Sequence, residues 1–172
     1  MQPTLVGPRV TIRPIVSEDW DGMFAAAKDP AIWAQHPDRD RYQGPVFRRY
    51  FDDAINSGSA FSFVDNESGA IIGSSRFHGL DLDAGEIEIG WTFLSRAYWG
   101  GSFNLEIKQL MLGHAFKYVE SVVFWVGTDN LRSRHAVLKI GGVLREGDWN
   151  RTVGDTVEPY VVYEIRRGQI PL

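Results

Sequence analysis

Two glutamates in one predicted strand are the residues of this chain whose type and spacing best suit catalysis. Glu86 and Glu88 lie in the segment EIEIGWTFL, residues 86–94, where polar and apolar residues alternate as they do in a strand. Successive side chains of a strand point to opposite faces, so both carboxylates are expected on one face. The core-facing set would be Ile87, Ile89, Trp91 and Phe93. Two carboxylates on one face are commonly just solvated, but a carboxylate beside a bound substrate can act as a general base.

Two adjacent glycines, Gly100 and Gly101, follow this strand and directly precede a run of helix-forming residues. The start of a helix exposes unpaired backbone N–H groups and the positive end of the helix dipole, which together suit an anion such as a pyrophosphate. Glycine lacks the side chain that would keep the anion away from the backbone. The alternative is a tight turn without a ligand. The stretch GGSFN matches neither the P-loop nor the dinucleotide-binding fingerprint, so it identifies no nucleotide class.

The remaining elements must hold these residues in place. Apolar patterning predicts strands at residues 9–15, 59–65, 70–78, 86–94, 121–127, and near 143–147 and 159–167. Helices are predicted from an N-cap at Ser17 to about Ala27, as a short turn within the loop 28–45, at 46–58, at 102–119, and from an N-cap at Asn130 to Ile140. The strand–helix–strand unit at 86–127 implies a parallel pair with a crossover helix. We therefore predict one α/β domain over residues 1–172, built on a mixed sheet.

The predicted helix at 102–119 is apolar around most of its girth, so it should lie buried against the sheet. One apolar stripe consists of Phe103, Ile107, Leu110, Met111, His114 and Tyr118. A second stripe consists of Leu105, Leu112, Phe116 and Val119, and a narrow polar edge consists of Glu106, Gln109, Gly113, Lys117 and Glu120.

Composition excludes several classes of function. The 172 residues include no cysteine, which rules out disulfides, thiolate metal sites and a cysteine nucleophile. The four histidines show no metal-ligand spacing, so no metal is expected. The formal net charge of −4 and the sequence pI near 5.5 disfavour nucleic-acid binding. No apolar run approaches the ~20 residues of a membrane span and no signal-peptide pattern is present, so we predict a cytoplasmic protein without membrane association.

Three stretches taken together resemble a known superfamily. EIEIGWTFLSRAYWGG, the apolar helix behind it and GTDNLRSRHAVLKIGG, with VTIRPI near the start, are similar to the GNAT N-acetyltransferases and, more narrowly, to their ribosomal-protein N-acetyltransferase-like branch. This resemblance implies a central, mostly antiparallel sheet that splays at its parallel pair, with helices on both faces. It also implies that the loop 97–102 holds the pyrophosphate of acetyl-CoA. The pantetheine arm would lie between the strands at 86–94 and 121–127.

The resemblance also implies roles for individual residues. Glu88 takes the position of the general base, and Glu86 is the alternative because a β-bulge would shift the alternation. Ser133 takes a position that can protonate the departing thiolate, although it could equally be a helix-surface serine. The residues expected at the coenzyme are Trp91, Thr92, Phe93, Ala97, Tyr98, Trp99, Gly100, Gly101, Ser102, Phe103, Asn104, Asn130, Arg132, Ser133 and Arg134. Those expected at the acceptor pocket, where they could instead only pack the loop, are Trp33, His36, Asp38 and Tyr42.

The sequence departs from the family pattern at four positions. Ala97, Ser102 and Asn104 replace the usual residues of the loop, and Val137 stands where the wider superfamily often has a tyrosine. Backbone N–H groups do not depend on the side chains, so they remain available to the phosphates. These differences are therefore expected to change how tightly the coenzyme binds more than which coenzyme binds.

The resemblance leads to a specific expectation about function. The chain should transfer an acetyl group, or another acyl group, from its coenzyme A thioester to a small-molecule or peptide amine. Without cysteine there can be no thioester acyl-enzyme, so the amine should attack directly in a ternary complex. A homodimer is possible. The alternatives are a non-catalytic acyl-CoA-binding module with the same fold and, on the glycines alone, a phosphate-ligand enzyme of unrelated chemistry.

Overall fold

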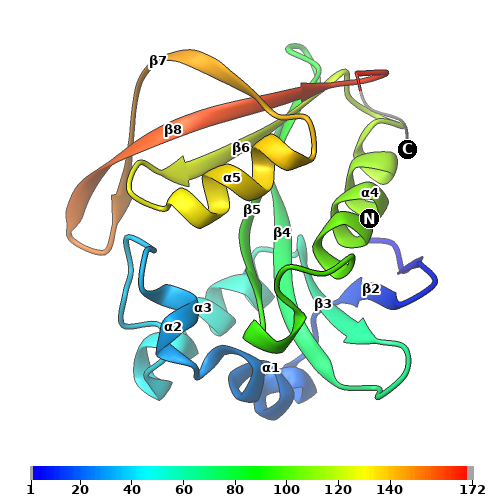
Figure 1. The fold of residues 1–172 in the computed structure, drawn as a ribbon, viewed down its shortest axis with the longest axis vertical. Coiled ribbons are helices and arrows are strands. Elements are labelled where there is room, and N and C mark those ends of the chain that lie inside the picture. Colours follow the sequence, from blue (N-terminus) through cyan, green and yellow to red (C-terminus); the bar gives the residue numbers. More distant parts are fainter. Residues whose placement is uncertain (1, 170–172) are drawn as a thin grey trace.

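The computed structural model of the chain describes residues 2–169. Within this range, eight strands form one open sheet in the order β1-β2-β3-β4-β5-β6-β8-β7 (Figure 1). The strands are β1 (Leu5–Val6), β2 (Val10–Pro14), β3 (Ala60–Asp65), β4 (Ile71–Asp81), β5 (Glu86–Leu94), β6 (Ser121–Gly127), β7 (Val143–Val153) and β8 (Thr156–Arg166). The α-helices are α1 (Trp20–Ala27), α2 (Pro30–Trp33), α3 (Gly44–Asn56), α4 (Phe103–Ala115) and α5 (Leu131–Lys139), and two 3₁₀ turns are Ser17–Asp19 and Arg96–Tyr98.

The sheet is mixed, as predicted. Over the described residues β5 and β6 run parallel, and the other neighbouring strands are antiparallel. The helix α4 makes the crossover between the two parallel strands, as expected for a connection too long for a hairpin. The prediction of a single domain with a mostly antiparallel sheet is confirmed.

Helices cover both faces of the sheet, and each face has its own apolar core. On one face, α4 and α5 contribute Ile107, Met111, Leu112 and Val137, and Ile140 follows directly after α5, in a cluster with the sheet residues Ile89 and Leu94. On the other face, α1, α2 and α3 contribute Met23, Trp33, Phe47 and Phe51 to a cluster that includes Phe93. The neighbours Phe93 and Leu94 thus belong to opposite cores, as alternation along a strand requires.

A β-bulge in β5 overturns one expectation about this strand. Ser74 of β4 pairs with Phe93, but Arg76 pairs with Gly90, so β5 carries one extra residue between the two pairs. Trp91, at the bulge, has a φ of +51°, which is unusual for a residue with a side chain. The bulge reverses the alternation beyond it. The prediction that Trp91 and Phe93 share the face of Ile87 and Ile89 is therefore wrong.

Other predicted boundaries also differ: the helix predicted at 46–58 runs from Gly44 to Asn56, and the strand predicted at 70–78 continues to Asp81. Ser17 does not cap a helix: it begins a 3₁₀ turn, and the buried Asp19 carboxylate accepts the N–H of Val16. The helix predicted to Val119 ends at Ala115, where the N–H groups of Lys117 and Tyr118 bond to carbonyls three residues back, those of His114 and Ala115, and no longer four. The last two strands are longer than predicted and form one long hairpin, β7–β8.

Candidate functional site

A gap opens between β5 and β6 in the middle of the sheet. The two strands pair only from Glu86 to Glu88 and from Ser121 to Val123. β5 continues to Leu94 and β6 to Gly127 without further pairing, and Figure 1 shows β6 turning away from β5. A splayed parallel pair leaves backbone groups and side chains of both strands accessible to an inserted ligand.

The glycine loop lies where β5 leads into α4. Gly100 has a φ of +71°, and a Cβ built on either Gly100 or Gly101 would meet nothing within 4 Å. Two aromatic side chains fix the loop: Trp99 Nε1 donates to the carbonyl of Leu94 at 2.8 Å, and Tyr98 donates to Asp65 at 3.1 Å. Within residues 2–169, the N–H groups of the two glycines and of Ser102 have no hydrogen-bond partner. The backbone here is open to an anion, which a tight turn alone would not require.

The start of α5 faces this region. Asn130 is its N-cap, and the Asn130 side chain accepts the N–H of Ser133 at 3.3 Å. Arg132 donates to the carbonyls of Ala31 and Ile32 in α2, and Arg134 donates to the carbonyl of Thr128 and the hydroxyl of Tyr163.

Arg132 also connects this helix to the loop. Its guanidinium carbon lies 4.0 Å from the ring centroid of Trp99, so it ties α5, the loop and α2 together. Both arginines expected at the coenzyme phosphates are thus bound to acceptors of the protein itself in this structure.

Glu88 lies at the last pair before the gap and is 5% exposed. Its two carboxylate oxygens accept hydrogen bonds from Arg151 of β7 at 2.9 and 2.7 Å. The guanidinium carbon of Arg151 lies 5.0, 4.7 and 5.6 Å from the ring centroids of Trp91, Trp125 and Tyr160. The Glu88 carboxylate is therefore held in place by a cation that three aromatic rings surround.

Glu86 has a different arginine partner. Arg145 donates to both of its oxygens, at 3.3 and 2.6 Å, and also pairs with Glu164 at 3.3 Å. The side chain of Glu86 is 28% exposed, against 6% for that of Glu88. Both predicted candidates for the general base are ion-paired, and Glu88 is the one enclosed beside the gap.

A hollow of about 330 Å³ lies on the face of the sheet that α2 and α3 cover, opposite the face covered by α4. The segment from α2 to α3, the turn of the β7–β8 hairpin and Trp91 line it, with Asp38, Arg41, Arg49, Tyr50 and Asp53 as its principal polar groups. Tyr50 donates to the backbone carbonyl of Trp91 at 2.7 Å, which holds the bulge against α3. Because Trp91 contacts both this hollow and Arg151, the hollow reaches the surroundings of Glu88.

The four residues predicted for the acceptor pocket have separate surroundings. Asp38 lines the hollow and pairs with Arg41 at 3.0 Å. His36 accepts the N–H of Asp38, and burial, reinforced by the charge of Arg41, lowers the pKa of His36 to about 3. Trp33 is 2% exposed in the α1–α3 core, and Tyr42 packs against that core. The structure thus brings Asp38 to the hollow and gives Trp33 a packing role.

Lys108 of α4 is a buried polar residue that the sequence reasoning missed. It is 6% exposed, and its Nζ donates to Thr92 Oγ1 at 3.0 Å. Burial lowers the pKa of Lys108 to about 7. A signal was available, since Lys108 lies three residues after Leu105 and four before Leu112, the spacing of the second apolar stripe. Arg151 gave no comparable signal because its partner Glu88 is distant in the sequence.

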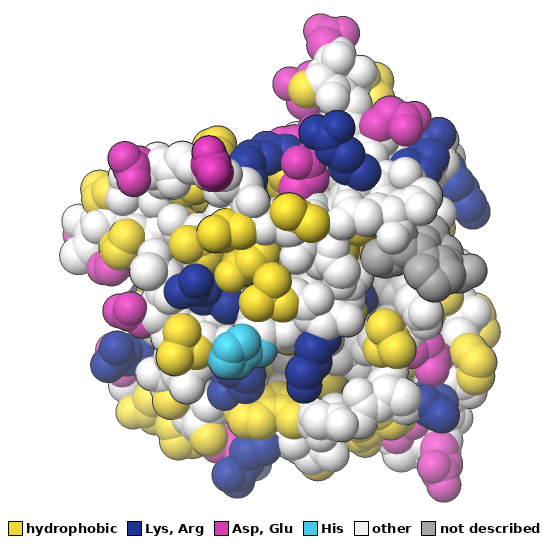
Figure 2. Space-filling model, turned by 45° about the horizontal axis from the view of Figure 1, so that its top comes forward, with side chains coloured by type: hydrophobic (Ala, Val, Ile, Leu, Met, Phe, Trp, Pro, Cys, Tyr) yellow, Lys and Arg dark blue, Asp and Glu magenta, His cyan; other side chains and the backbone are white. Residues whose placement is uncertain are grey.

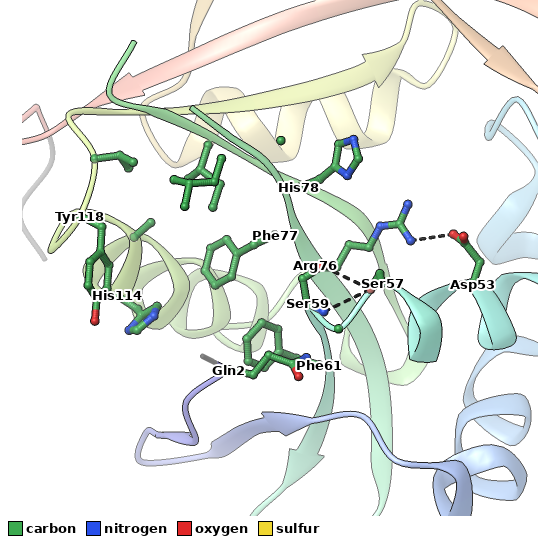
Figure 3. Close-up of a pocket in the computed structure, with 16 residues that line it drawn as sticks. Gln2, Asp53, Ser57, Ser59, Phe61, Arg76, Phe77, His78, His114 and Tyr118 are labelled. Atoms are coloured by element: carbon green, nitrogen blue, oxygen red, sulfur yellow. Dashed lines mark hydrogen bonds and ion pairs between the residues drawn. The ribbon is translucent and has the colours of Figure 1, made fainter. Parts of the chain in front are cut away.

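A larger cavity, of about 830 Å³, lies beyond the other end of α4. Figure 3 shows Phe61 and Phe77 near its centre, with His114 and Tyr118 on one side and the ion pair of Arg76 and Asp53 on the other. It lies far along α4 from the glycine loop, and it shares Asp53 with the smaller hollow.

Three further findings concern the surface, metal binding and membrane-spanning helices. Figure 2 shows one face of the molecule, where apolar side chains gather near the middle with Lys and Arg side chains among them. In residues 2–169, no group of three or more His, Asp or Glu side chains could hold a metal ion. No helix of the described chain has the length and apolarity to cross a membrane.

Comparison with known proteins places the chain among acetyltransferases. The family model described as an acetyltransferase (GNAT) domain matches residues 9–143. An uncharacterised N-acetyltransferase, p20, of Bacillus licheniformis is 26% identical over 175 residues, covering 95% of this chain and 97% of the relative.

Solved structures share the fold at low identity. A GCN5-related N-acetyltransferase from Brucella melitensis has a TM-score of 0.85 at 19% identity, covering 96% of this chain and 79% of that one. A Vibrio cholerae structure, for which ribosomal-protein-serine acetyltransferase activity has been suggested, has a TM-score of 0.75 at 11% identity, covering 97% and 100% of the two chains. At such identities the likeness concerns the fold.

Proposed function

The chain belongs to the acetyltransferase (GNAT) domain family, and from that premise we propose that it transfers an acetyl group from acetyl-CoA to a primary amine. The observation that carries the proposal is the gap between β5 and β6, which leads from an open glycine loop to the carboxylate of Glu88. The residues present fit the coenzyme: unpaired N–H groups at Gly100, Gly101 and Ser102 suit its phosphates. The unpaired strand edges would hold its pantetheine arm, and the coenzyme would supply the acyl thioester.

The acceptor amine would reach the gap from the hollow beside Trp91. An amine is mostly protonated near neutral pH and must lose a proton to become a nucleophile. Glu88 is the buried carboxylate beside the gap and would take this proton directly or through water. Since Arg151 binds both of its oxygens, proton uptake by Glu88 must loosen one of these hydrogen bonds. The backbone of β5 near the bulge would polarise the thioester carbonyl.

A second function, a non-catalytic acyl-CoA-binding module, is favoured by one observation. The bidentate pairing of Glu88 with Arg151 could make this carboxylate a purely structural ion pair. The family pattern is also altered at Ala97, Ser102 and Val137.

Two measurements separate these functions. Isothermal titration with acetyl-CoA and longer acyl-CoAs tests coenzyme binding, and release of free thiol across a panel of amines tests transfer. Failure of every acyl-CoA to bind would refute both functions. Tight binding without thiol release from any amine would favour the module.

The glycine loop should set coenzyme affinity. Gly100→Val places a β-branched side chain at a φ of +71° and in the open space next to the unpaired N–H groups. We expect the Kd for acetyl-CoA, measured by titration, to rise at least ~10-fold, because the phosphates would lose their close approach to the backbone. The matched control is Gly58→Val, which imposes similar backbone strain at a φ of +61° away from the loop. An equal loss of affinity in both variants would point to general destabilisation.

The acceptor should be a weakly basic amine, such as a peptide α-amine, in preference to a lysine side chain. An α-amino group has a pKa of roughly 7.7–8.0 and lysine about 10.4. Presenting the neutral amine at about pH 7.4 therefore costs only ~0.5 kcal/mol for the former and about 4 for the latter, at ~1.36 kcal/mol per pKa unit. Mass spectrometry of peptides that carry both groups would show which is acetylated. Preferential acetylation of the lysine would contradict this prediction.

A further inference from the structure

A lysine amino group lies between the unpaired parts of β5 and β6. Nζ of Lys108 donates to Thr92 of β5, beyond the last pair of that strand with β6. The same atom lies 5.3 Å from the ring centroid of Phe124. Phe124 directly follows Val123, the last residue of β6 that pairs with β5. The amino group therefore contacts both strands where they no longer pair, one residue beyond the last pair on β6 and four residues beyond it on β5.

No anionic group among residues 2–169 pairs with this cation. Among residues 2–169 its hydrogen-bond acceptor is the hydroxyl of Thr92, which is also bonded to the hydroxyl of Ser75 at 2.7 Å. Its ring partner, Phe124, is uncharged as well, and no carboxylate of the described chain forms an ion pair with Lys108. A buried cation without a counter-ion destabilises the fold, so its position favours an anion that arrives with a ligand.

Resting on the proposed function, we infer that Lys108 receives the sulfur of the acyl-CoA and gives a proton to that sulfur when the thioester is cleaved. In this step the amine nitrogen forms a bond to the carbonyl carbon, and the C–S bond breaks with its electron pair going to sulfur. A proton from the Lys108 ammonium converts the sulfur to a thiol. The proton of the attacking amine goes to Glu88 or to water, and solvent later reprotonates Lys108.

The acid–base properties of Lys108 suit this role. Because burial lowers the pKa of its ammonium to about 7, the group is partly protonated near neutral pH and can both give and regain a proton. Ser133, the other candidate donor, lies on α5 and not on α4, so the two residues can be tested separately.

The first test measures the ionisation of bound coenzyme A and needs no turnover. The chain has no cysteine, so the ultraviolet absorbance of a thiolate in the complex comes from coenzyme A alone. A thiol beside an ammonium ionises more readily. We expect the thiol to titrate at least about one pH unit lower in the wild-type complex than in the complex with Lys108→Met. Desulfo-coenzyme A should bind both proteins equally, which shows that the variant keeps the gap intact.

The second test measures turnover against pH. Lys108→Met should lower kcat at least ~10-fold and remove the fall in kcat at alkaline pH that deprotonation of the wild-type lysine causes. Lys117→Met, which replaces an exposed lysine just after α4, is the matched control and should behave as the wild type. If the role of Lys108 were only structural, Lys108→Met would change neither the pH at which the bound thiol titrates nor the shape of the kcat–pH profile.

Several outcomes would overturn the inference about Lys108. They are an equal thiol titration in the two complexes, an unchanged kcat in Lys108→Met, and loss of the alkaline limb in Ser133→Ala alone. A wild type that does not bind coenzyme A would overturn both this inference and the proposed function. If the wild type binds coenzyme A but releases no thiol from acetyl-CoA, the proposed function is refuted. The titration of the bound thiol would still test whether Lys108 lies beside the sulfur.

Discussion

Replacing Glu88 by Gln is expected to lower kcat at least ~10²-fold, within the usual range for the loss of one general base. Gln keeps the shape of Glu and can still accept a hydrogen bond from Arg151, but it cannot take a proton from the amine. Binding of acetyl-CoA should change little, because the glycine loop lies beyond the far end of β5. The measurements are kcat against pH by thiol release and the Kd of acetyl-CoA by titration.

The pH dependence and a neighbouring variant make this result specific. Raising the pH should partly rescue Glu88→Gln, since more of the amine then arrives already neutral. Glu86→Gln is the matched control, because Glu86 lies two residues earlier on the strand and also pairs with an arginine. Unchanged turnover in Glu88→Gln would show that Glu88 is not the general base. A loss confined to Glu86→Gln would transfer the role to Glu86.

Replacing Lys108 by Met should stabilise the protein near neutral pH. The pKa of Lys108 is about 7 in the folded state and about 10.4 for an ordinary lysine. Between these values the unfolded chain binds a proton that the folded chain does not, so the destabilisation grows as the pH falls from ~10.4 to ~7 and is constant below. At ~1.36 kcal/mol per pKa unit, the variant could gain up to about 5 kcal/mol in free energy of unfolding at pH 6–7. Met has a similar length and flexibility, so the core should close around it.

Urea denaturation of wild type and variant at pH 7 and near pH 10 would measure this gain. The difference between the two proteins should shrink as the pH rises, because the unfolded lysine then loses its proton as well. The exposed Lys117→Met should change the free energy of unfolding by less than ~0.5 kcal/mol at either pH. A gain that does not depend on pH would contradict the explanation. A stabler but slower variant would show that the buried lysine is kept for function at the expense of stability.

The sequence by itself determined the mixed sheet, the parallel pair and the open loop at Gly100. The parallel pair and the loop depend on residues close together in the chain: β5, the loop, α4 and β6 follow one another between Glu86 and Gly127. Alternation, glycine placement and helix periodicity are local properties, and each has a direct conformational cause. For the same reason the N-cap Asn130 could be predicted from its place before α5.

Three features of the site were decided only by the tertiary structure. The bulge at Trp91 depends on the register between β4 and β5, and pairing across strands is not a property of either strand alone. The partner of Glu88 is Arg151, which lies 63 residues further along the chain and reaches it because the β7–β8 hairpin is long. The burial of Lys108 depends on its contacts with Thr92 of β5 and Phe124 of β6. From the sequence alone, a lysine is expected to be a solvated charge, so its burial can be recognised only once the positions of both strands are known. Sequence patterns specify which face of an element is apolar, but contacts between distant elements depend on how those faces pack together, and that packing also sets the charge and proton affinity of the site.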